Sequence, residues 1–418
     1  MLNKFKLFRL FKWIYIIMLF LFCISCASPD KINYGWETDL KLAKKTLLEQ
    51  EAGFTAEPDK QKKFASAMDK IINNLDEYNN DDEVEIELSK AIATISQSHT
   101  RLQIKRQPVL PLKFYIQNGR PFVIAALNDY KNILFAELTK IEETSADKII
   151  QDLSSVIPHD NEQSLNQDMP DYLITPSYLK GLGYISNKNA IKMTFKLVNQ
   201  QEKEIVISPL EITSSVLKDF AIPYEKELSF QLQKSNYALQ YIKQKKTIYL
   251  AYNSCEEDPD YPIQQLKSDL KKILKKNSDT YFIIDLRNNG GGDSQVIDPI
   301  FKDNFLQTLF KGHTVVLIGR GTASSAIINA MEAKDYLEAT LIGEPTGGNP
   351  NAPGEVKSTL LQGTNNTISY TTKSWTSTGV NHNSLLPDIS ISYTVEDYKN
   401  ATDPILKAAF QKIQNESG

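Results

Sequence analysis

The chain has 418 residues, which is long enough for two or three domains with apolar cores of their own. Its composition, 41% hydrophobic and 23% charged, is ordinary for a globular protein. The net charge of −4 lacks the basic excess that nucleic-acid-binding proteins carry, so nucleic acid is not expected as a partner.

Residues 1–25 predict a secretory signal peptide of lipoprotein type. Basic residues precede a short apolar run, 13–24, which is too short to span a bilayer. Cys26 stands at the expected cleavage point, as in bacterial lipoprotein signals, where this cysteine carries the lipid. Cys23 departs from that pattern, and an ordinary secretory signal is the alternative. The sequence thus predicts a bacterial cell-envelope protein, lipid-anchored on the periplasmic or surface face of a membrane.

Residues 26–105 predict an N-terminal helical region. Apolar side chains recur at helical spacing over 40–48 and 64–75, and a third helix is expected over 84–96. The acidic stretch 76–83 between them is expected to be a solvated loop.

Residues 106–235 predict a β-rich module. One amphipathic helix is expected over 146–157, among strands at 112–116, 121–126, 191–197 and 204–207. The order of strand, strand, Leu138–Glu143 and helix resembles a PDZ module, which binds an extended peptide by adding it as a strand. Glu142-Glu143 stand where that module usually shows Asn-Gly. A β-rich spacer that only positions the rest of the chain is the alternative.

Residues 236–418 alternate strands with helices, which predicts an α/β core with largely parallel pairing. The expected strands are 247–252, 280–286, 314–318 and 339–342, and the expected helices are 263–274, 295–310 and 325–335.

Two motifs in this core point to chemistry. Tyr281–Gly292 is an apolar run that ends in a charged turn and three glycines, and Gly321-Thr-Ala-Ser-Ser-Ala326 places two serines at a predicted helix start. Glycines let a substrate carbonyl approach the main chain, and a helix N-terminus favours a developing oxyanion. Acyl transfer needs these features together, so the pair predicts a serine hydrolase.

The same motifs carry a family resemblance. Asp285-Leu-Arg-Asn-Asn-Gly-Gly-Gly292 resembles the glycine signature of the tail-specific (C-terminal-processing) serine peptidases and their relative, the tricorn core protease. Gly321–Ala326 resembles their nucleophile segment, and Gly343-Glu-Pro-Thr-Gly-Gly348 the turn that follows it. The resemblance implies a crotonase-like spiral for the core, which periodicity alone does not distinguish from a doubly wound sheet. It also implies polypeptide substrates.

By its place in the motif, Ser324 is the expected nucleophile and Ser325 the runner-up. The N–H groups of Ser325 and Gly291 are the expected oxyanion donors. The alternative for Ser324 is a helix N-cap without chemistry, since serine is among the best caps.

The base is not the family lysine, because Asn349 stands at its place and cannot take a proton. The tricorn-type arrangement implies another base, a histidine preceded by serine well upstream. Ser96-Gln-Ser-His-Thr-Arg101 resembles that segment, with His99 as base and Ser98 as its neighbour. An imidazole titrates in the range that neutral-pH catalysis needs. A structural histidine is the alternative, and His382 is the fallback base.

The group that orients the base stays open. Tricorn-type enzymes have a carboxylate shortly before a Pro-Asp pair, but Pro387-Asp388 is preceded by Asn381 and His382 instead. Asn381 and Glu344 are the candidates. Asp285 and Arg287 are expected to form a structural pair beside the glycines.

The remaining reactive residues predict no further chemistry. Cys255 is expected to be a small buried hydrophobe rather than a nucleophile. His159 suggests a turn, and His313 precedes a strand. No cluster has metal-ligand spacing, and the glycine run lacks the residues of a phosphate loop, so no cofactor is expected.

Together these features predict a serine endopeptidase of the cell envelope that cleaves extended or partly unfolded polypeptides through an acyl-enzyme. Because the family lysine and carboxylate are missing, a catalytically inactive relative that binds peptides as an envelope lipoprotein is the alternative. The sequence leaves the oligomeric state open.

Overall fold

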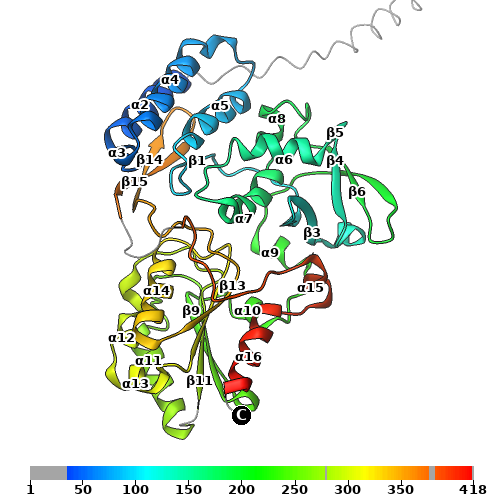
Figure 1. Cartoon of the computed structure of the whole chain (residues 1–418). Coiled ribbons are helices and arrows are strands. Elements are labelled where there is room, and N and C mark those ends of the chain that lie inside the picture. The colour runs from blue at the N-terminus through cyan, green and yellow to red at the C-terminus, as the bar shows by residue number, and fades with distance from the viewer. Residues whose placement is uncertain (1–34, 278–279, 376–381, 417–418) are drawn as a thin grey trace, which may run out of the picture.

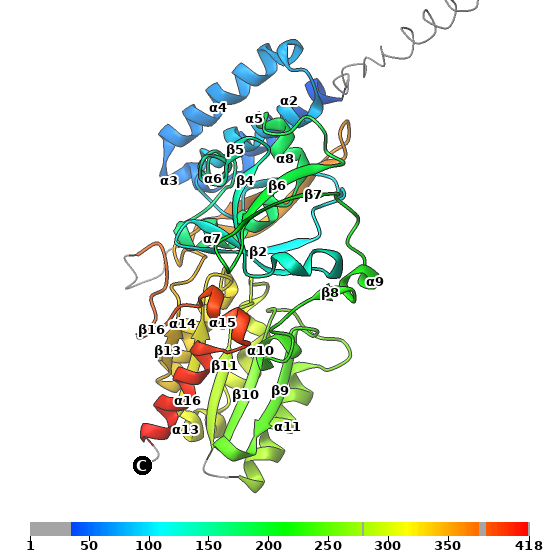
Figure 2. The same cartoon turned by 90° about the vertical axis from the view of Figure 1, so that its right-hand side faces the viewer.

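The computed structural model describes residues 35–277, 280–375 and 382–416 (Figure 1). The predicted signal peptide, Cys26 and Asn381 lie outside the described residues. Within the described ranges, no helix has both the length and the apolar character needed to cross a membrane. Seen from the side, the helical region and the β-rich module form the upper part of the molecule, and the α/β core forms the lower part (Figure 2).

The N-terminal region is a helical arm, as expected. It comprises α2 (Trp36–Gln50), α4 (Pro58–Asn73) and α5 (Asp81–Ala93), with the short helix α3 (Gly53–Ala56) between the first two. Helix α5 begins three residues before the predicted start because the Asn80 side chain caps it, accepting a hydrogen bond from the N–H of Glu83. The acidic stretch is therefore only partly a loop. Its last residues form the first turn of α5, where negative carboxylates interact favourably with the positive end of the helix dipole.

A late hairpin belongs with this arm rather than with the core. Strands β14 (Gly354–Leu361) and β15 (Asn366–Lys373) form a sheet with β1 (Arg101–Gln103), and Leu361 and Ile368 pack against the arm. The segment 236–418 is thus not one α/β unit, and the prediction was wrong for residues 354–373. An isolated hairpin cannot bury its apolar face, so it is stable only where the arm covers it.

Buried carboxylates of the arm hold the hairpin in place. Asp39 accepts hydrogen bonds from the N–H groups of Gly363 and Thr364, and Glu51 accepts from the N–H and the hydroxyl of Thr371. Both carboxylates are buried, so these bonds replace the water that each lost on folding.

The middle module contains an antiparallel sheet in the order β2-β3-β4-β6-β7, with β5 and β8 at its margins. Glu142 adopts a φ of 48° in the turn between β4 and β5, the left-handed conformation that Asn-Gly usually provides. Helix α6 covers the first part of the expected helix, and the sequence analysis did not predict α7, which lies against β2, or α8. The bounds are Leu112–Gln117 (β2), Arg120–Leu127 (β3), Glu137–Ile141 (β4), Thr144–Ser145 (β5), Ile191–Lys196 (β6), Glu202–Ile207 (β7), Phe220–Ala221 (β8), Ala146–Ser154 (α6), Glu162–Leu173 (α7) and Pro176–Gly181 (α8).

The core sheet has the order β16-β13-β12-β11-β10-β9, and only the β9–β10 pair is antiparallel. The strands run over Tyr237–Ile242 (β9), Thr247–Tyr252 (β10), Tyr281–Asp285 (β11), Thr314–Ile318 (β12), Thr340–Gly343 (β13) and Ile389–Ser390 (β16). The expected mixed α/β class is confirmed. The crotonase-like spiral and the PDZ assignment remain predictions.

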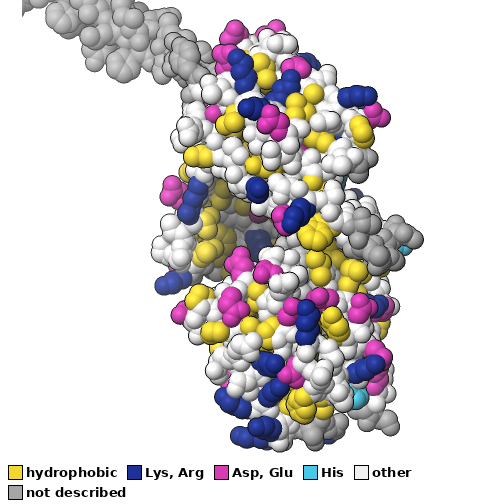
Figure 3. Space-filling model, turned by 90° about the vertical axis from the view of Figure 1, so that its left-hand side faces the viewer, with side chains coloured by type: hydrophobic (Ala, Val, Ile, Leu, Met, Phe, Trp, Pro, Cys, Tyr) yellow, Lys and Arg dark blue, Asp and Glu magenta, His cyan; other side chains and the backbone are white. Residues whose placement is uncertain are grey.

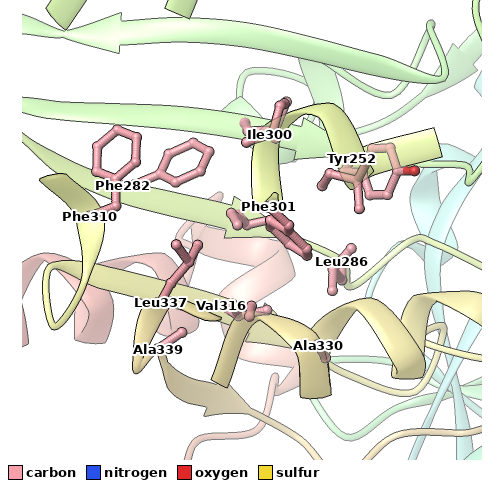
Figure 4. Packing of buried hydrophobic residues seen from close by; sticks show 14 of the residues in the cluster. Tyr252, Phe282, Leu286, Ile300, Phe301, Phe310, Val316, Ala330, Leu337 and Ala339 are labelled. Atoms are coloured by element: carbon pink, nitrogen blue, oxygen red, sulfur yellow. The ribbon is translucent and has the colours of Figure 1, made fainter. Parts of the chain in front are cut away.

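Helices cover both faces of this sheet. Helices α11 (Ile263–Lys276) and α14 (Ser325–Leu337) contribute to the core on one face, and α16 (Pro404–Glu416) packs on the other. Figure 4 shows the first core, where the rings of Phe282 and Phe310 stack with centroids 4.6 Å apart. The helix expected over 295–310 is divided into a 3₁₀ turn (Ser294–Ile297), α12 (Asp298–Phe301) and α13 (Asn304–Phe310), because Asp303 caps α13.

A buried ion cluster ties the glycine turn to the C-terminal helix. Arg287 donates to both oxygens of Asp285, with Nε 2.9 Å from Oδ1, and to both oxygens of Asp403, at 2.8 Å each. The pairing of Asp285 with Arg287 was predicted, but the part played by Asp403, at the start of α16, was not. Since all three groups are buried, each charge depends on its partners for the stabilisation that water no longer supplies.

Asp403→Ala is therefore expected to destabilise the fold by about 3–5 kcal/mol, because it leaves the Arg287 guanidinium buried with only half of its carboxylate partners. Urea unfolding followed by circular dichroism measures the change. Glu37→Ala is the control, since it removes an exposed ion pair with Lys41 and should unfold like the wild type. Equal midpoints for all three proteins would contradict the assignment.

Candidate active site

Ser324 lies in the turn that joins β12 to α14, immediately before the helix. Its backbone has φ 53° and ψ −129°, a conformation that costs a non-glycine residue about 1–3 kcal/mol. Its side chain makes no capping hydrogen bond to the helix. The helix-cap alternative is therefore wrong, and the half-buried hydroxyl is held at a strained turn without serving the helix.

The glycine run packs directly against this serine. A Cβ added to Gly291 would lie 2.6 Å from Cβ of Ser324 and 3.1 Å from the backbone nitrogen of Ser325, so only glycine allows this approach. Gly291 also has a φ of 109°, which side chains disfavour. The fold thus brings together the two motifs on which the sequence analysis rests.

The two expected oxyanion donors differ in their present bonding. The N–H of Ser325 is in the first turn of α14, where backbone N–H groups have no partner within the helix. The N–H of Gly291, in contrast, donates to the side-chain oxygen of Asn289 at 2.9 Å. Asn289 is buried and also donates to the carbonyl of Tyr252, so it links the glycine run to the end of β10.

Ser325, the second nucleophile candidate, has a structural role. Its hydroxyl donates to the carbonyl of Gly292 at 2.6 Å, and the residue is buried. The loops are joined further by a bond from the Thr322 hydroxyl to the carbonyl of Leu286. Ser324 is therefore the serine whose hydroxyl is not engaged in holding the loops together.

His99 follows α5 at the junction of the arm and the hairpin. The Ser369 hydroxyl donates to its carbonyl at 2.8 Å, which anchors the segment on β15. The ring Nδ1 is buried and has no hydrogen-bond partner among the described residues. Burial lowers the pKa of His99 below its ordinary value of 6.5, and the nearby Asp160 carboxylate acts in the opposite direction. A neutral imidazole is thus favoured near neutral pH.

A carboxylate that the sequence analysis missed lies beside Ser98. The Ser98 hydroxyl donates to Asp160 at 2.6 Å, and its N–H donates to the second oxygen of the same carboxylate at 3.0 Å. No sequence signal pointed to Asp160, because it is 62 residues away in a loop of the middle module.

The loop of Asp160 connects the arm to the nucleophile turn. Asn161 donates to the carbonyls of Thr346 and Asn383, at 3.3 and 2.7 Å. Two residues further along, the N–H of Gly348 donates to the carbonyl of Thr322, at the start of the nucleophile turn. The loop that carries Asp160 and Asn161 therefore bonds the arm on one side and the segments that adjoin the Ser324 turn on the other.

Residues 297–391, which include the Ser324 turn, match the model of peptidase family S41. Through this segment the chain resembles peptidase family S41. Among solved structures, mature CPAF superposes with a TM-score of 0.62 at 13% identity, over 90% of this chain and 95% of that chain. Mature CPAF complexed with lactacystin gives a TM-score of 0.62 at 12% identity, over 90% and 97%.

These likenesses show that this chain has a fold similar to that of mature CPAF over nearly its whole length. The recognition of the tail-specific peptidases in the sequence is confirmed, and a serine-type peptidase is the enzyme class that the family match supports.

Other candidate residues lie in structural settings. Glu344 is paired with Arg320 at 3.0 Å, and its role in orienting the base stays a prediction. The side chain of Asn349, at the place of the S41 lysine, accepts from the N–H of Asn351. His382 is exposed. Burial raises the pKa of the Cys255 thiol to about 11, which agrees with a buried hydrophobe rather than a nucleophile.

The last two histidines have local roles. The ring of His159 bonds the carbonyl of Ile157 at 2.7 Å, as a turn residue would, and that of His313 lies edge-on to Tyr281. Across the described ranges, no group of His, Cys, Asp and Glu side chains could hold a metal ion.

A groove of about 370 Å³ separates β2 and α7 from the ends of the core strands. Arg320 spans it, donating to the carbonyl of Ile116 at 2.6 Å with its guanidinium 4.6 Å from the ring centre of Tyr115. Lys113 and Asp171 lie on the module side of the groove. The space-filling view of Figure 3 shows one face of the molecule, hollowed between its upper and lower parts.

Gly291→Ala is expected to push Ser324 out of place and to slow its reaction with a fluorophosphonate probe by about 10²-fold, the typical cost of a misplacement of about 1 Å. Gly290→Ala is the matched control, because a Cβ there would meet nothing within 4 Å. The rate of probe labelling measures both. Equal labelling of the two variants would show that the close contact at Gly291 does not govern the serine.

Proposed function

We propose that this protein is a serine endopeptidase of the cell envelope, which cleaves extended or partly unfolded polypeptides through an acyl-enzyme on Ser324. One observation carries the proposal: the Ser324 hydroxyl lies at a strained helix start, makes no cap, and packs against a glycine run and the N–H of Ser325. A strained turn that presents a serine beside backbone donors is the arrangement that acyl transfer uses.

In the proposed reaction, Oγ of Ser324 attacks the scissile carbonyl carbon while His99 takes the hydroxyl proton. The oxyanion accepts hydrogen bonds from the N–H of Ser325 and from that of Gly291, which exchanges the Asn289 oxygen for the substrate oxygen. Collapse of the intermediate breaks the C–N bond, and His99 gives its proton to the leaving amine. Water, deprotonated by His99, then hydrolyses the ester and releases Ser324.

Polypeptide substrates are supported by the groove beside β2. This strand pairs with β3 on one side only, so its other edge faces α7 and the groove. An extended peptide can add to such an edge through main-chain hydrogen bonds. The groove also reaches Gly321, three residues before Ser324, so a peptide held there would run toward the nucleophile.

The location in the envelope rests on the sequence. A basic segment, a short apolar run and Cys26 form a lipoprotein-type signal, and a lipid on Cys26 would hold the enzyme on a membrane. The polypeptide substrates would then be proteins that reach that surface.

Ser324→Ala is expected to lower casein and fluorogenic-peptide cleavage by at least about 10⁴-fold, because the acyl-enzyme cannot form. Ser325→Ala should still react with the probe, although more slowly, since its hydroxyl holds the Gly292 carbonyl and is not the proposed nucleophile. Equal cleavage by Ser324→Ala and the wild type would remove Ser324 from the mechanism. A folded wild type that never reacts with a fluorophosphonate would favour the inactive, peptide-binding alternative.

The pH profile of kcat/KM provides a separate test of His99. The base must be neutral to accept a proton, and burial lowers its pKa, so activity should be retained on acidification until the pH falls below 6.5. His99→Ala should abolish activity. His382→Asn should leave unchanged the fall of kcat/KM on acidification, the acidic limb of the pH profile. Loss of activity in His382→Asn, but not in His99→Ala, would make His382 the base.

A further inference from the structure

A carboxylate is bonded to the residue before the proposed base, although not where the family resemblance places one. The segment before Pro387-Asp388 offers no acid at the expected position. Yet the residue preceding the proposed base is bound through two of its atoms to one carboxylate, that of Asp160. This acid comes from the middle module, 164 residues before Ser324 (324 − 160).

We propose that Asp160 supplies the carboxylate of this active site, acting through Ser98 to orient His99 and to stabilise the imidazolium that forms during acyl transfer. Asp160 is thus a positioning residue, and the proposal rests on the proposed function. A base that takes a proton from serine needs such a group, because it must keep one tautomer and accept a transient positive charge.

The contacts of Ser98 show how the acid can act. Both carboxylate oxygens accept from Ser98, one from its N–H and one from its hydroxyl, so the serine is fixed in both backbone and side chain. Arg101 donates from Nε to the carbonyl of Ser98 at 2.7 Å and holds it from the other side. The hydroxyl oxygen of Ser98 keeps its lone pairs, so it can accept a hydrogen bond from the adjacent imidazole.

His99 has an open position for this bond. Its Nδ1 is buried without a partner, and a buried ring nitrogen left unpaired is costly. Three charges act on the imidazole: Asp160 and Glu51 favour its protonated form, and Arg101 opposes it. Glu51 bonds the neutral donors Thr100 and Thr371, and Arg101 is paired with Asp168. Asp160, in contrast, is bonded to the residue next to the base.

The segment before Pro387-Asp388 contains no acid at the expected position, but it bonds the loop that carries Asp160. The Asn383 amide donates to the carbonyl of Asp160 at 3.5 Å, and the amide of Asn161 donates back to the carbonyl of Asn383 at 2.7 Å. The Asp160 N–H is bonded to Ser164 in the first turn of α7. The segment that lacks a carboxylate therefore fastens the loop that carries one.

Asp160→Asn tests this inference, with cleavage of a fluorogenic peptide as the assay. We expect kcat to fall at least about tenfold, with KM unchanged. The fall should be smaller than the roughly 10⁴-fold loss seen when the acid bonded directly to the histidine of a serine triad is removed. Because the Asp160 charge favours the imidazolium, its loss should also move the acidic limb of the pH profile to lower pH. Asp160→Glu, which restores the charge, should recover part of kcat and return the limb toward that of the wild type.

Asp152→Asn is the matched control, because it changes an aspartate of the same module that pairs with Lys148 and Tyr184 and does not contact the Ser98 segment. It should retain the kcat and the acidic limb of the wild type. The double variant Ser98→Ala/Asp160→Asn should lose no more than Ser98→Ala alone, since the two residues are proposed to act as one unit. Multiplied losses in the double variant would contradict action through Ser98.

A histidine titration by NMR keeps this test independent of activity. His99 in the folded Asp160→Asn variant should titrate at lower pH than in the wild type, because the Asp160 charge favours the imidazolium. An unmoved His99 titration, or a loss of kcat without a shifted limb, overturns the role of Asp160 while leaving Ser324 as nucleophile. An inactive, unlabelled wild type would instead defeat the proposed function and the catalytic role of Asp160 with it.

Discussion

The close approach of two loops at the ends of β11 and β12 is the constraint on which the site depends. Neighbouring parallel strands end at the same edge of a sheet, so the glycine run after β11 and the serine turn after β12 must share one small space. Gly291 has no room for a side chain there, and Ser324 adopts a strained backbone conformation. The Ser325 hydroxyl and Asn289 hold the loops in that contact.

A second set of contacts joins the segment of His99, the proposed base, to the chain that follows Ser324. The late hairpin leaves the core, completes a sheet with β1 and packs on the helical arm, so the arm is in contact with the chain that follows Ser324. Buried carboxylates of the arm bond the hairpin, and the Ser369 hydroxyl bonds the carbonyl of His99. The segment of the proposed base is therefore held by the same stretch of chain that follows the proposed nucleophile.

Much of this arrangement could be read from local patterns. The strand Tyr281–Asp285, the strand Thr314–Ile318 and helix α14 lie within one or two residues of their predicted positions, because continuous apolar runs and a serine-marked helix start are strong local signals. The hairpin of β14 and β15 was missed because β14 is largely exposed and carries no clear alternation. Helix α7 was missed since a proline and several polar residues obscure its apolar face.

The sequence by itself indicated the resemblance to the tail-specific peptidases and the α/β class of the core, and it singled out Ser324, because each depends on residues close together in the chain. Only the tertiary structure decided which serine hydroxyl holds the loops, that the Gly291 N–H is already bonded, that Glu344 pairs with Arg320, and that Asp160 binds Ser98. Those facts concern pairs of polar groups distant in sequence. Which donor meets which acceptor is settled by packing, when burial removes water and each polar group must bond the neighbour that the fold provides.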